Sequence, residues 1–477
     1  MSKIVFLYRD DFIHLFDQAI NSKVFMPDEV IRVYHTWNCF RKSRASIGRY
    51  YVIEEFQKNS NNYEFSIDKV NDEIITLTDG EYDMRKVISN DRVLEFADPV
   101  YAVDRVLLYY NFWNWLFSKD HPNFIVNEIM SSMFAHIPEI VGRKYNVQYL
   151  GIYASALYVN RFMFMYGDKG DSKKIRYFYC NMEPNDKETQ EASRFLDEFV
   201  KKRKVSHLES SLAGGFKGKL KQVASRLFFS RKHRSIFFDS FDYMNAAIRK
   251  NWIPYQFGLV WANWGKYSEV NFSKFDPDES IDFFYPFHVE PEGVLTYWTS
   301  GEHKKQIYTV FSLLNVFKLD RIHIKDHISS FGYRPVSDYK ILNCMKRVVL
   351  LDNKVPAVEI IKKSKCVIVV SGTTGMEAFL LGKHVVALAQ CHYSFVRSIK
   401  FVPDLKNTSQ QELEDYLSTK IDKDNQDKIR YLVAFYKGSY DCKLDQWNTD
   451  EENGKKFAIG LKQETEWFIE KFTTVLP

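Results

Sequence analysis

The chain has 477 residues, of which 45% are hydrophobic, 27% are charged and 16% are aromatic, and its formal net charge is +5. This length exceeds one ordinary core and predicts two domains of about 150–250 residues each. The small net charge alone says nothing about nucleic acid, but the sequence shows neither a recognition-helix signature nor an RNA-binding motif, so we expect no nucleic-acid partner. No run reaches the roughly 18 apolar residues that a membrane-spanning helix requires.

The cysteines indicate a reducing compartment. They are scattered without a CxxC pair, at Cys39, Cys180, Cys344, Cys366, Cys391 and Cys442. This spacing is typical neither of a disulfide framework nor of a zinc site. The opening residues hold too few apolar positions before Asp10 and Asp11 to be typical of a signal peptide. We therefore expect a cytoplasmic protein and no metal site.

The first half of the chain predicts an α/β domain over residues 1–275. Apolar runs and a helical pattern predict strands at 3–8, 123–128 and 147–153 and a helix at 129–146. Residues from about 50 to 100 lack such periodicity, and we interpret them as a long irregular region.

Residues 201–234 form a basic stretch within this domain. They hold eleven Lys or Arg residues and a single acid, Glu209. In a helix one face would be apolar, with Phe216, Leu220, Val223, Leu227 and Phe228. A basic amphipathic helix favours docking to an anionic membrane surface. The alternative is an ordinary helix that covers the edge of the domain.

The second half predicts a Rossmann-like domain over residues 276–440. Strands are expected at 281–288, 321–327, 347–352, 366–372 and 384–390, and helices at 301–317 and 356–364. Strands that alternate with helices predict βαβ units and a parallel sheet covered on both faces. Further helical patterns occupy 410–418, 423–438 and 454–472, and residues 441–477 are expected to be a helical tail.

The turn in "SKCVIVVSGTTGMEAFLLGKHVVAL", residues 364–388, suits a phosphate. A strand ends at Ser371 and a helix begins within the following Gly372, Thr373 and Thr374. The first turn of a helix has unpaired N–H groups and a partial positive charge, and glycine allows close approach. Glu377 is expected to project from this turn and to accept sugar hydroxyls.

Two other predicted strands end in polar side chains at the same edge of the sheet. "FYPFHVEPEG" delivers His288, Glu290 and Glu292. "IHIKDHISSFGYR" delivers Lys325 and His327, with Arg334 after them. Since ligands of open α/β sheets bind at the carboxyl ends of the strands, these residues are the candidate ligand site.

The order and spacing of "PFHVEPE", "IKDHIS" and "VVSGTTGMEAFLLGKHVVAL" resemble the capsule polysaccharide biosynthesis family, which includes the β-Kdo transferases. The similarity covers roughly residues 280–395. Family members typically carry Gln, Pro and Pro where this chain has Glu290, Ile328 and His384. The resemblance implies a GT-B glycosyltransferase, with two Rossmann-like αβ domains facing a central cleft. It also implies that the C-terminal domain binds the nucleotide-sugar donor, with no metal or other cofactor.

A fainter similarity to the same family lies in "FIVNEIMSSMFAHIPEIVGRKYNVQYLGIYASALYVNRFMF". On this mapping Asn127, Ser155, Asn160 and Arg161 face the acceptor side of the cleft. Glycosyl transfer needs a carboxylate near the anomeric carbon, as base or nucleophile. We assign Glu128 as the first candidate. Asp10 or Asp11, after the first strand, is the second.

The expected function is transfer of a sugar from a nucleotide donor to a capsule or other surface-polysaccharide acceptor. Kdo or a related acid sugar, linked to CMP, is the first candidate donor. The acceptor would be lipid-linked or an oligosaccharide, and the protein would rest at the inner face of the plasma membrane. Two alternatives stay open, a sugar-nucleotide epimerase of GT-B shape and a non-catalytic glycan-binding or scaffold protein.

Overall fold

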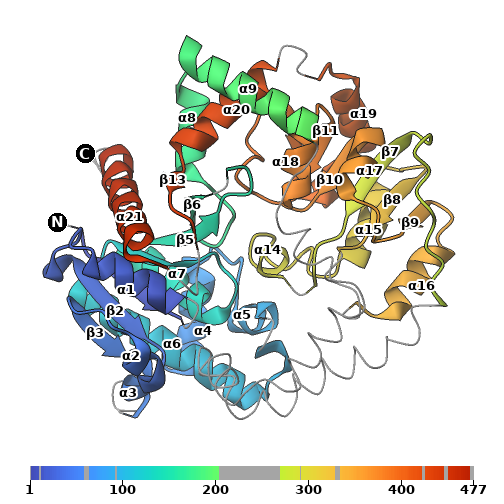
Figure 1. Ribbon diagram of the computed structural model, residues 1–477. Helices are drawn as coiled ribbons and strands as arrows, with labels where there is room; N and C mark the ends of the chain where they lie inside the picture. The colour runs from blue at the N-terminus through green and yellow to red at the C-terminus, as the bar shows by residue number, and fades with distance from the viewer. Residues whose placement is uncertain are drawn as a thin grey trace. The chain divides into compact units, whose positions relative to one another are not determined.

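The computed structural model describes residues 2–9, 12–58, 64–91, 94–158, 160–202, 269–290, 292–327, 334–421, 425–444 and 449–472. Within these ranges the chain forms two compact units. Residues up to Asp168 and from Ser439 onward form unit 1, and residues from Lys169 to Gly438 form unit 2. Each unit holds one sheet flanked by helices, as Figure 1 shows. The predicted fold class, α/β with two Rossmann-like domains, is confirmed.

Unit 1 is built on a seven-stranded sheet with the order β13-β6-β5-β4-β1-β2-β3. The strands are β1 (Ile4–Tyr8), β2 (Val30–Tyr34), β3 (Arg49–Val52), β4 (Phe124–Glu128), β5 (Gln148–Ala154), β6 (Arg161–Tyr166) and β13 (Tyr440–Asp441). The pairs from β3 to β5 are parallel, whereas β6 is antiparallel to both β5 and β13. The parallel part places the carboxyl ends of β1, β2, β4 and β5 at one edge.

Two groups of helices flank this sheet. They are α1 (Ile13–Asn21), α2 (Trp37–Lys42), α3 (Ile53–Lys58), α4 (Ile67–Leu77), α5 (Met84–Asn90), α6 (Pro99–Asp120), α7 (Met133–Tyr145) and α21 (Glu451–Phe472), with short 3-10 turns at Pro27–Glu29 and Leu94–Phe96. Helices α1 and α21 pack together, and their Phe16 and Phe457 share a core with Phe6 and Phe124 of the strands. Helices α4 to α7 pack against one another.

The region from about 50 to 100 is not irregular, which corrects our expectation. It holds α3, α4 and α5, and the last two begin at side-chain caps. The Ser66 hydroxyl accepts a hydrogen bond from the Lys69 N–H, and the Asp83 carboxylate accepts one from the Lys86 N–H. Such caps pair backbone donors that a helix leaves free at its start, so they are sequence signals for helices.

Unit 2 contains a six-stranded, fully parallel sheet with the order β12-β11-β10-β7-β8-β9. Its strands are β7 (Ile281–Pro286), β8 (Ile322–Lys325), β9 (Val348–Leu351), β10 (Ser364–Val369), β11 (His384–Ala387) and β12 (Ile399–Phe401). The five strands predicted for this half are therefore present, and β12 was missed. Strand β10 is buried at every position except Lys365, as expected of a strand covered on both faces.

The helices of unit 2 come from both ends of its sequence. They are α8 (Lys173–Asn181), α9 (Asp186–Lys202), α14 (Gly293–Thr296), α15 (Gln306–Val316), α16 (Val336–Cys344), α17 (Ala357–Lys363), α18 (Thr373–Leu380), α19 (Gln410–Ser418) and α20 (Gln426–Lys437), with a 3-10 turn at Leu405–Asn407. Helix α20 packs on α8 and α9. The hydroxyl of Tyr179 on α8 donates to the Asp427 carboxylate on α20 at 2.5 Å.

The division into units departs from the expected boundaries at 275 and 440. Helices α8 and α9 lie in unit 2, although the sequence places them long before its sheet. Residues 441–477 are not a separate tail, because β13 joins the sheet of unit 1 and α21 enters its core. Local periodicity indicates where a helix forms, but it does not indicate which core the apolar face of that helix packs against.

Candidate functional site

Three neighbouring strands of unit 2 bring the predicted donor residues to one edge of the sheet. Strand β7 lies between β10 and β8, and all three run in the same direction. His288 follows β7, Lys325 ends β8 and Ser371 follows β10. The carboxyl ends of parallel strands are where open α/β sheets bind ligands. The edge therefore combines imidazole, ammonium and hydroxyl groups in one place.

The turn from β10 into α18 is tightly packed around two glycines. Gly372 is the N-cap of α18, and a Cβ atom added there would lie 3.1 Å from both Cε1 and Nε2 of the His288 ring. A Cβ at Gly375 would lie 2.6 Å from Cγ2 of Val369. Thr373 and Thr374, the first helical residues, are half-buried. The His288 ring is thus held beside the N-terminus of α18, where backbone N–H groups favour an anion.

Ser371, which precedes α18, and Glu377, which lies within it, are both buried. The Ser371 hydroxyl is buried and has no hydrogen-bond partner among the residues that the structure describes. Glu377 does not project from the first turn as expected, because α18 is buried from Gly375 to Leu380 and the Glu377 side chain is 7% exposed. The half-buried Thr373 and Thr374 are therefore more accessible to a ligand than either Ser371 or Glu377.

The segment after β8 carries the charged groups of the edge. Lys325 is buried, whereas His327 is exposed to solvent. Desolvation by neighbouring atoms lowers the pKa of His327, and the Glu292 carboxylate opposes this effect. Nδ1 of His288 lies 3.0 Å from the Glu292 carboxylate. The structure thus brings His288, Glu292 and the segment after β8 together, as the sequence predicted.

Sequence reasoning missed two residues of this site, Asp326 and Gln306. Asp326 is bound to the guanidinium of Arg334, with Nε–Oδ2 and Nη2–Oδ1 distances of 2.8 and 3.2 Å. Gln306, the first residue of α15, contacts the backbone of His288 and the carboxylate of Glu290. The position of Asp326 between Lys325 and His327 was a usable signal, but nothing in the local sequence marks Gln306.

The carboxyl edge of the sheet in unit 1 places Glu128 in an ion pair. Its carboxylate contacts the guanidinium of Arg9, which follows β1, and accepts a hydrogen bond from the Ser131 hydroxyl. The guanidinium carbon of Arg9 lies 5.6 Å from the centroid of the Phe134 ring. The side chain of Glu128 is 17% exposed. A carboxylate held in this way has a fixed position, with one part open to solvent.

Asn127 and His35 lie beneath this edge. Asn127 is fully buried, and neither its amide oxygen nor its nitrogen has a hydrogen-bond partner among the described residues. His35 follows β2 and its Nδ1 lies 3.0 Å from the hydroxyl of Tyr109. Burial, and then the charge of Arg9, lower the pKa of His35 to about 3. His35 was not among the predicted residues, because a single His after an unpredicted strand gives no signal.

Of the predicted acceptor residues, Ser155 and Asn160 belong to the turn between β5 and β6, and Arg161 is the first residue of β6. The Ser155 hydroxyl accepts a hydrogen bond from the Tyr158 N–H at 2.8 Å, and Asn160 is exposed with a φ of +67°. The Arg161 guanidinium donates to the Ser439 hydroxyl at 2.9 Å and pairs with Asp441. Arg161 therefore ties the β5–β6 hairpin to β13.

Several predicted features lie outside the described residues. These are Asp10 and Asp11, Ile328 and the basic stretch beyond Lys202. In the part of the chain that the structure describes, no helix is both long and apolar enough to cross a membrane.

One group of described residues has metal-ligand geometry, at His136, Glu139 and Asp168, whose candidate ligand atoms lie within 4.8 Å of one another. The guanidinium of Arg143 already binds this group. It donates to both carboxylate oxygens of Glu139, at 3.0 and 3.2 Å, and lies 3.4 Å from Asp168. A cation that pairs with both carboxylates leaves them little net charge for a metal ion. We assign no metal to this group.

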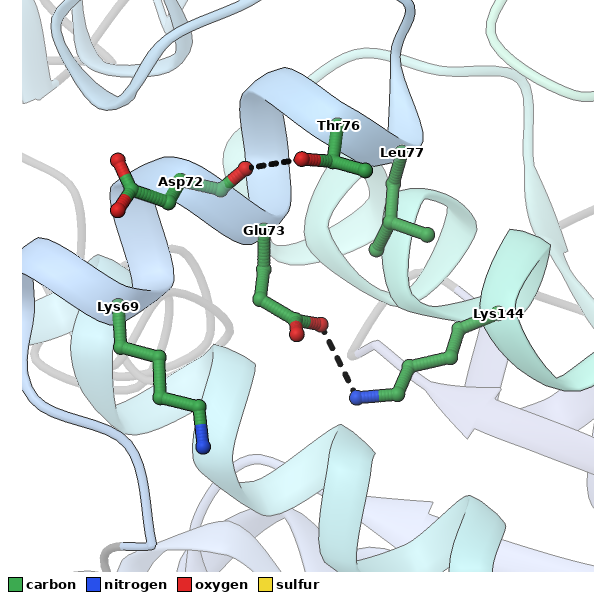
Figure 2. A pocket seen from close by; sticks show the side chains of 6 residues that line it. All are labelled: Lys69, Asp72, Glu73, Thr76, Leu77 and Lys144. Carbon is green, nitrogen blue, oxygen red and sulfur yellow. Dashed lines mark hydrogen bonds and ion pairs between the residues drawn. The ribbon is translucent and has the colours of Figure 1, made fainter.

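A shallow pocket of about 310 Å³ lies on α4 and the end of α7. Lys69, Asp72, Glu73, Thr76, Leu77 and Lys144 line it, as Figure 2 shows. Nζ of Lys144 lies 3.0 Å from the Glu73 carboxylate, which also accepts a hydrogen bond from the Tyr110 hydroxyl at 2.8 Å. Glu73 and Lys144 of the pocket pair with each other, and we assign the pocket no ligand.

Comparison with known proteins supports the resemblance over part of the chain. Residues 320–397 match the model of a family described as capsule polysaccharide biosynthesis protein. The matched segment contains β8, β9, β10, α18 and β11 and thus the polar segment after β8 and the β10–α18 turn. The resemblance seen in the motifs is confirmed for this segment. No curated protein sequence matches the chain.

Solved structures that match the chain include two of KpsC from Thermosulfurimonas dismutans. KpsC, β-Kdo 2,4 transferase, has a TM-score of 0.37 and 11% identity over 72% of this chain and 87% of that chain. KpsC, β-Kdo 2,7 transferase, has a TM-score of 0.32 and 11% identity over 74% and 89%. The UDP-GlcNAc 2-epimerase of Methanocaldococcus jannaschii, in complex with UDP-GlcNAc and UDP, has a TM-score of 0.27 and 10% identity over 97% and 100%. Scores this low carry no argument about activity.

Proposed function

We propose that the chain is a glycosyltransferase of the capsule polysaccharide biosynthesis type, which moves a sugar from a nucleotide donor to a surface-glycan acceptor. One observation carries the proposal. The three neighbouring strands β8, β7 and β10 deliver Lys325, His288 and the turn at Gly372 to one edge of unit 2, and two of these strands lie in the segment that matches the family.

The donor phosphate would bind at the N-terminus of α18. The backbone N–H groups of Thr373 and Thr374 begin this helix, and the Ser371 hydroxyl is beside them. Lys325 and His288 would add positive charge or hydrogen-bond donors. Fixed donors that stabilise the leaving phosphate can replace a metal ion in this reaction. An acid sugar such as Kdo, carried by CMP, fits a site with these cationic groups.

The chemical step needs a carboxylate at the acceptor side, and Glu128 is our candidate. The bond between the anomeric carbon and the donor phosphate breaks, and the nucleotide leaves with the bonding electrons. A bond forms from the acceptor oxygen to the anomeric carbon, and the proton of that hydroxyl passes to the carboxylate. The Arg9 guanidinium and the Ser131 hydroxyl would hold Glu128 in position. Asp10 and Asp11 stay as the second candidates.

The test is nucleotide binding followed by turnover. Calorimetric titration with CMP, UMP and UDP should show binding of one nucleotide, and His327→Ala should weaken it without lowering the melting temperature. The side chain of His327 is exposed, so its loss removes a ligand contact and no core packing. If His327→Ala melts early, or binds each nucleotide as well as the wild type, the donor site is wrong.

Turnover then separates the possible activities. Incubation with a panel of CMP- and UDP-linked sugars should release nucleotide only when an oligosaccharide acceptor is present. Conversion of a donor without an acceptor would instead indicate an epimerase. Nucleotide binding without conversion of any donor would indicate a binding or scaffold protein.

A further inference from the structure

The guanidinium of Arg334 joins the ends of two strands of unit 2. Its Nε and Nη2 atoms donate to Asp326 after β8, and Nη2 also donates to the carbonyl of His288 after β7, at 3.0 Å. Its Nη1 atom lies 2.7 Å from Oε1 of Glu290. The guanidinium carbon lies 4.6 Å from the centroid of the Phe287 ring. Only 1% of the Arg334 side chain is exposed, so its contacts connect the segments after β7 and β8 inside the unit.

Gln306 completes this link from the start of α15. Its Oε1 accepts a hydrogen bond from the His288 N–H at 2.7 Å, and its Nε2 donates to the His288 carbonyl at 3.0 Å. Its own N–H and Nε2 donate to Oε1 of Glu290, at 2.8 and 3.0 Å. The backbone of His288 is therefore hydrogen-bonded at both its N–H and its carbonyl. Oε1 of Glu290 accepts its hydrogen bonds from Gln306, a residue of the same unit.

The held residue leads directly to the turn that begins α18. The imidazole of His288 packs against Gly372, and its Nδ1 lies 3.0 Å from Glu292. Because the ring has little freedom between these neighbours, a small shift of the His288 backbone moves it relative to Gly372. Such displacements of a binding group by fractions of an ångström weaken binding and catalysis.

We propose that Glu290 is a positioning residue, which acts through Gln306 and Arg334 on His288, and that it does not bind the donor. Its Oε1 atom accepts two N–H groups of Gln306 and lies 2.7 Å from Nη1 of Arg334, and an amide oxygen in the same place can accept all three. The contacts therefore need an acceptor atom at this position, and Asp326 still balances the charge of Arg334. A glutamine should replace Glu290 without changing the donor, and an alanine should not. The nucleotide part of this inference rests on the proposed function, whereas the effect on His288 does not.

The experiment compares Glu290→Gln with Glu290→Ala in the full chain. Glu412→Ala is the matched control, because Glu412 is an acid of unit 2 in an exposed pair with Lys400. The first measurement is the NMR signal of the His288 ring in protein labelled with 13C at histidine Cε1, without ligand. Its assignment comes from the signal lost in His288→Asn. The second measurement is titration with CMP and with UDP.

We expect Glu290→Gln to leave the His288 signal in place and the nucleotide dissociation constant within about 3-fold. Glu290→Ala should move the His288 signal and weaken binding by about 10-fold, the scale of one or two lost hydrogen bonds. Should the alanine variant fail to fold, Glu290→Asp, which keeps the charge and withdraws the oxygen, should move the same signal. The control should change neither measurement.

Two results would overturn the inference. An unmoved His288 signal in both the alanine and aspartate variants would mean that Glu290 positions nothing. Equal loss of nucleotide affinity in the glutamine and alanine variants, with the His288 signal unmoved in the glutamine variant, would mean that Glu290 binds the donor itself. If the wild type binds neither CMP nor UDP, the proposed donor site fails instead, and the His288 signal still decides the role of Glu290.

Discussion

The sheets of the two units each end beside an arginine that pairs with a glutamate and lies over a phenylalanine ring, but the two pairs are used differently. Arg9 pairs with Glu128 in unit 1, where the glutamate side chain is 17% exposed. Arg334 pairs with Glu290 in unit 2, where the glutamate side chain is 9% exposed, and it also binds Asp326. The first pair leaves part of a carboxylate within reach of a substrate. The second pair buries both of its side chains, and we call it the closed pair and the first one the open pair.

The two pairs differ in how far their acids are enclosed. Arg334 contacts two carboxylates and a backbone carbonyl, so its loss would leave two buried carboxylates without their cation. Arg9 contacts a carboxylate and, at 3.5 Å, the hydroxyl of Ser131. An ion pair at a strand end is therefore not enough to identify a reactive carboxylate. The exposure of the acid separates the two roles.

The largest effect is expected when the closed pair is broken. Arg334→Met should destabilise unit 2 by about 3–5 kcal/mol, because two buried carboxylates then lack their cation. Arg9→Met should cost unit 1 only about 1–3 kcal/mol, since Glu128 can still reach water. Urea unfolding, followed by a probe in each unit, measures both losses. Equal losses would contradict the distinction between a closed and an open pair.

The next effect concerns the open carboxylate. Glu128→Gln should lower turnover by about 10²-fold or more, the scale of a lost acid–base group, and should leave nucleotide affinity unchanged. If Glu128 only stabilises its surroundings, the variant should stay active and lose on the order of 1 kcal/mol of stability. Turnover and melting temperature on one preparation distinguish these outcomes, and retained activity would direct attention to Asp10 and Asp11.

A smaller effect should appear in the pH dependence of stability. The pKa of His35 is about 3 in the folded protein, below its ordinary value of 6.5, so only the unfolded chain takes up this proton between the two values. Above pH 6.5 neither the folded nor the unfolded chain binds this proton, so His35 causes no change of the free energy of unfolding with pH. Below pH 6.5 the free energy of unfolding falls by about 1.4 kcal/mol per pH unit as the pH drops toward 3.

His35→Asn should flatten this fall for the unfolding transition of unit 1. His392 of unit 2, whose pKa burial also lowers to about 3, provides the comparison. His392→Asn should flatten only the transition of unit 2. The measurement is urea unfolding between pH 7 and pH 5.5. If His35→Asn leaves the pH dependence of the free energy of unfolding of unit 1 unchanged, His35 is not the group that causes it.

The smallest effect is expected in the pocket of Figure 2, where an acid–base pair is open to water. Lys144→Met removes the partner of Glu73 and should lower the free energy of unfolding by less than about 1 kcal/mol, because exposed ion pairs contribute little. Turnover should not change. Melting temperature and initial rates test both statements, and a clear loss of turnover would show that this pocket takes part in function.

The sequence predicted those parts of the fold that depend on neighbouring residues along the chain. Continuous apolar runs identified β10 and its neighbours in unit 2, and glycines with threonines identified the turn before α18. Strand β2 was missed because Arg32 interrupts a short run, and its guanidinium is bound by the carbonyls of Ala45 and Gly48.

The contacts that define the site were harder to predict. Glu128 was identified, but its partner Arg9 was not, because only the parallel pairing of β1 with β4 brings them together. Gln306 likewise acts on residues 16 and 18 positions earlier in the chain. A single sequence indicates which side chains end a strand. It does not indicate which of them bind one another, because that depends on the order of strands in the sheet.

The connection between the units has a consequence for synthesis of the protein. Of the described residues, those up to Asp168 and those from Ser439 onward belong to unit 1, and α21 packs on α1 with Phe457, Ala458 and Leu461 in the core. The apolar side chains that α21 covers, among them Phe16, stay uncovered until α21 leaves the ribosome. The core of unit 1 therefore begins synthesis before unit 2 but is completed after it, which makes its early half a candidate client for chaperones.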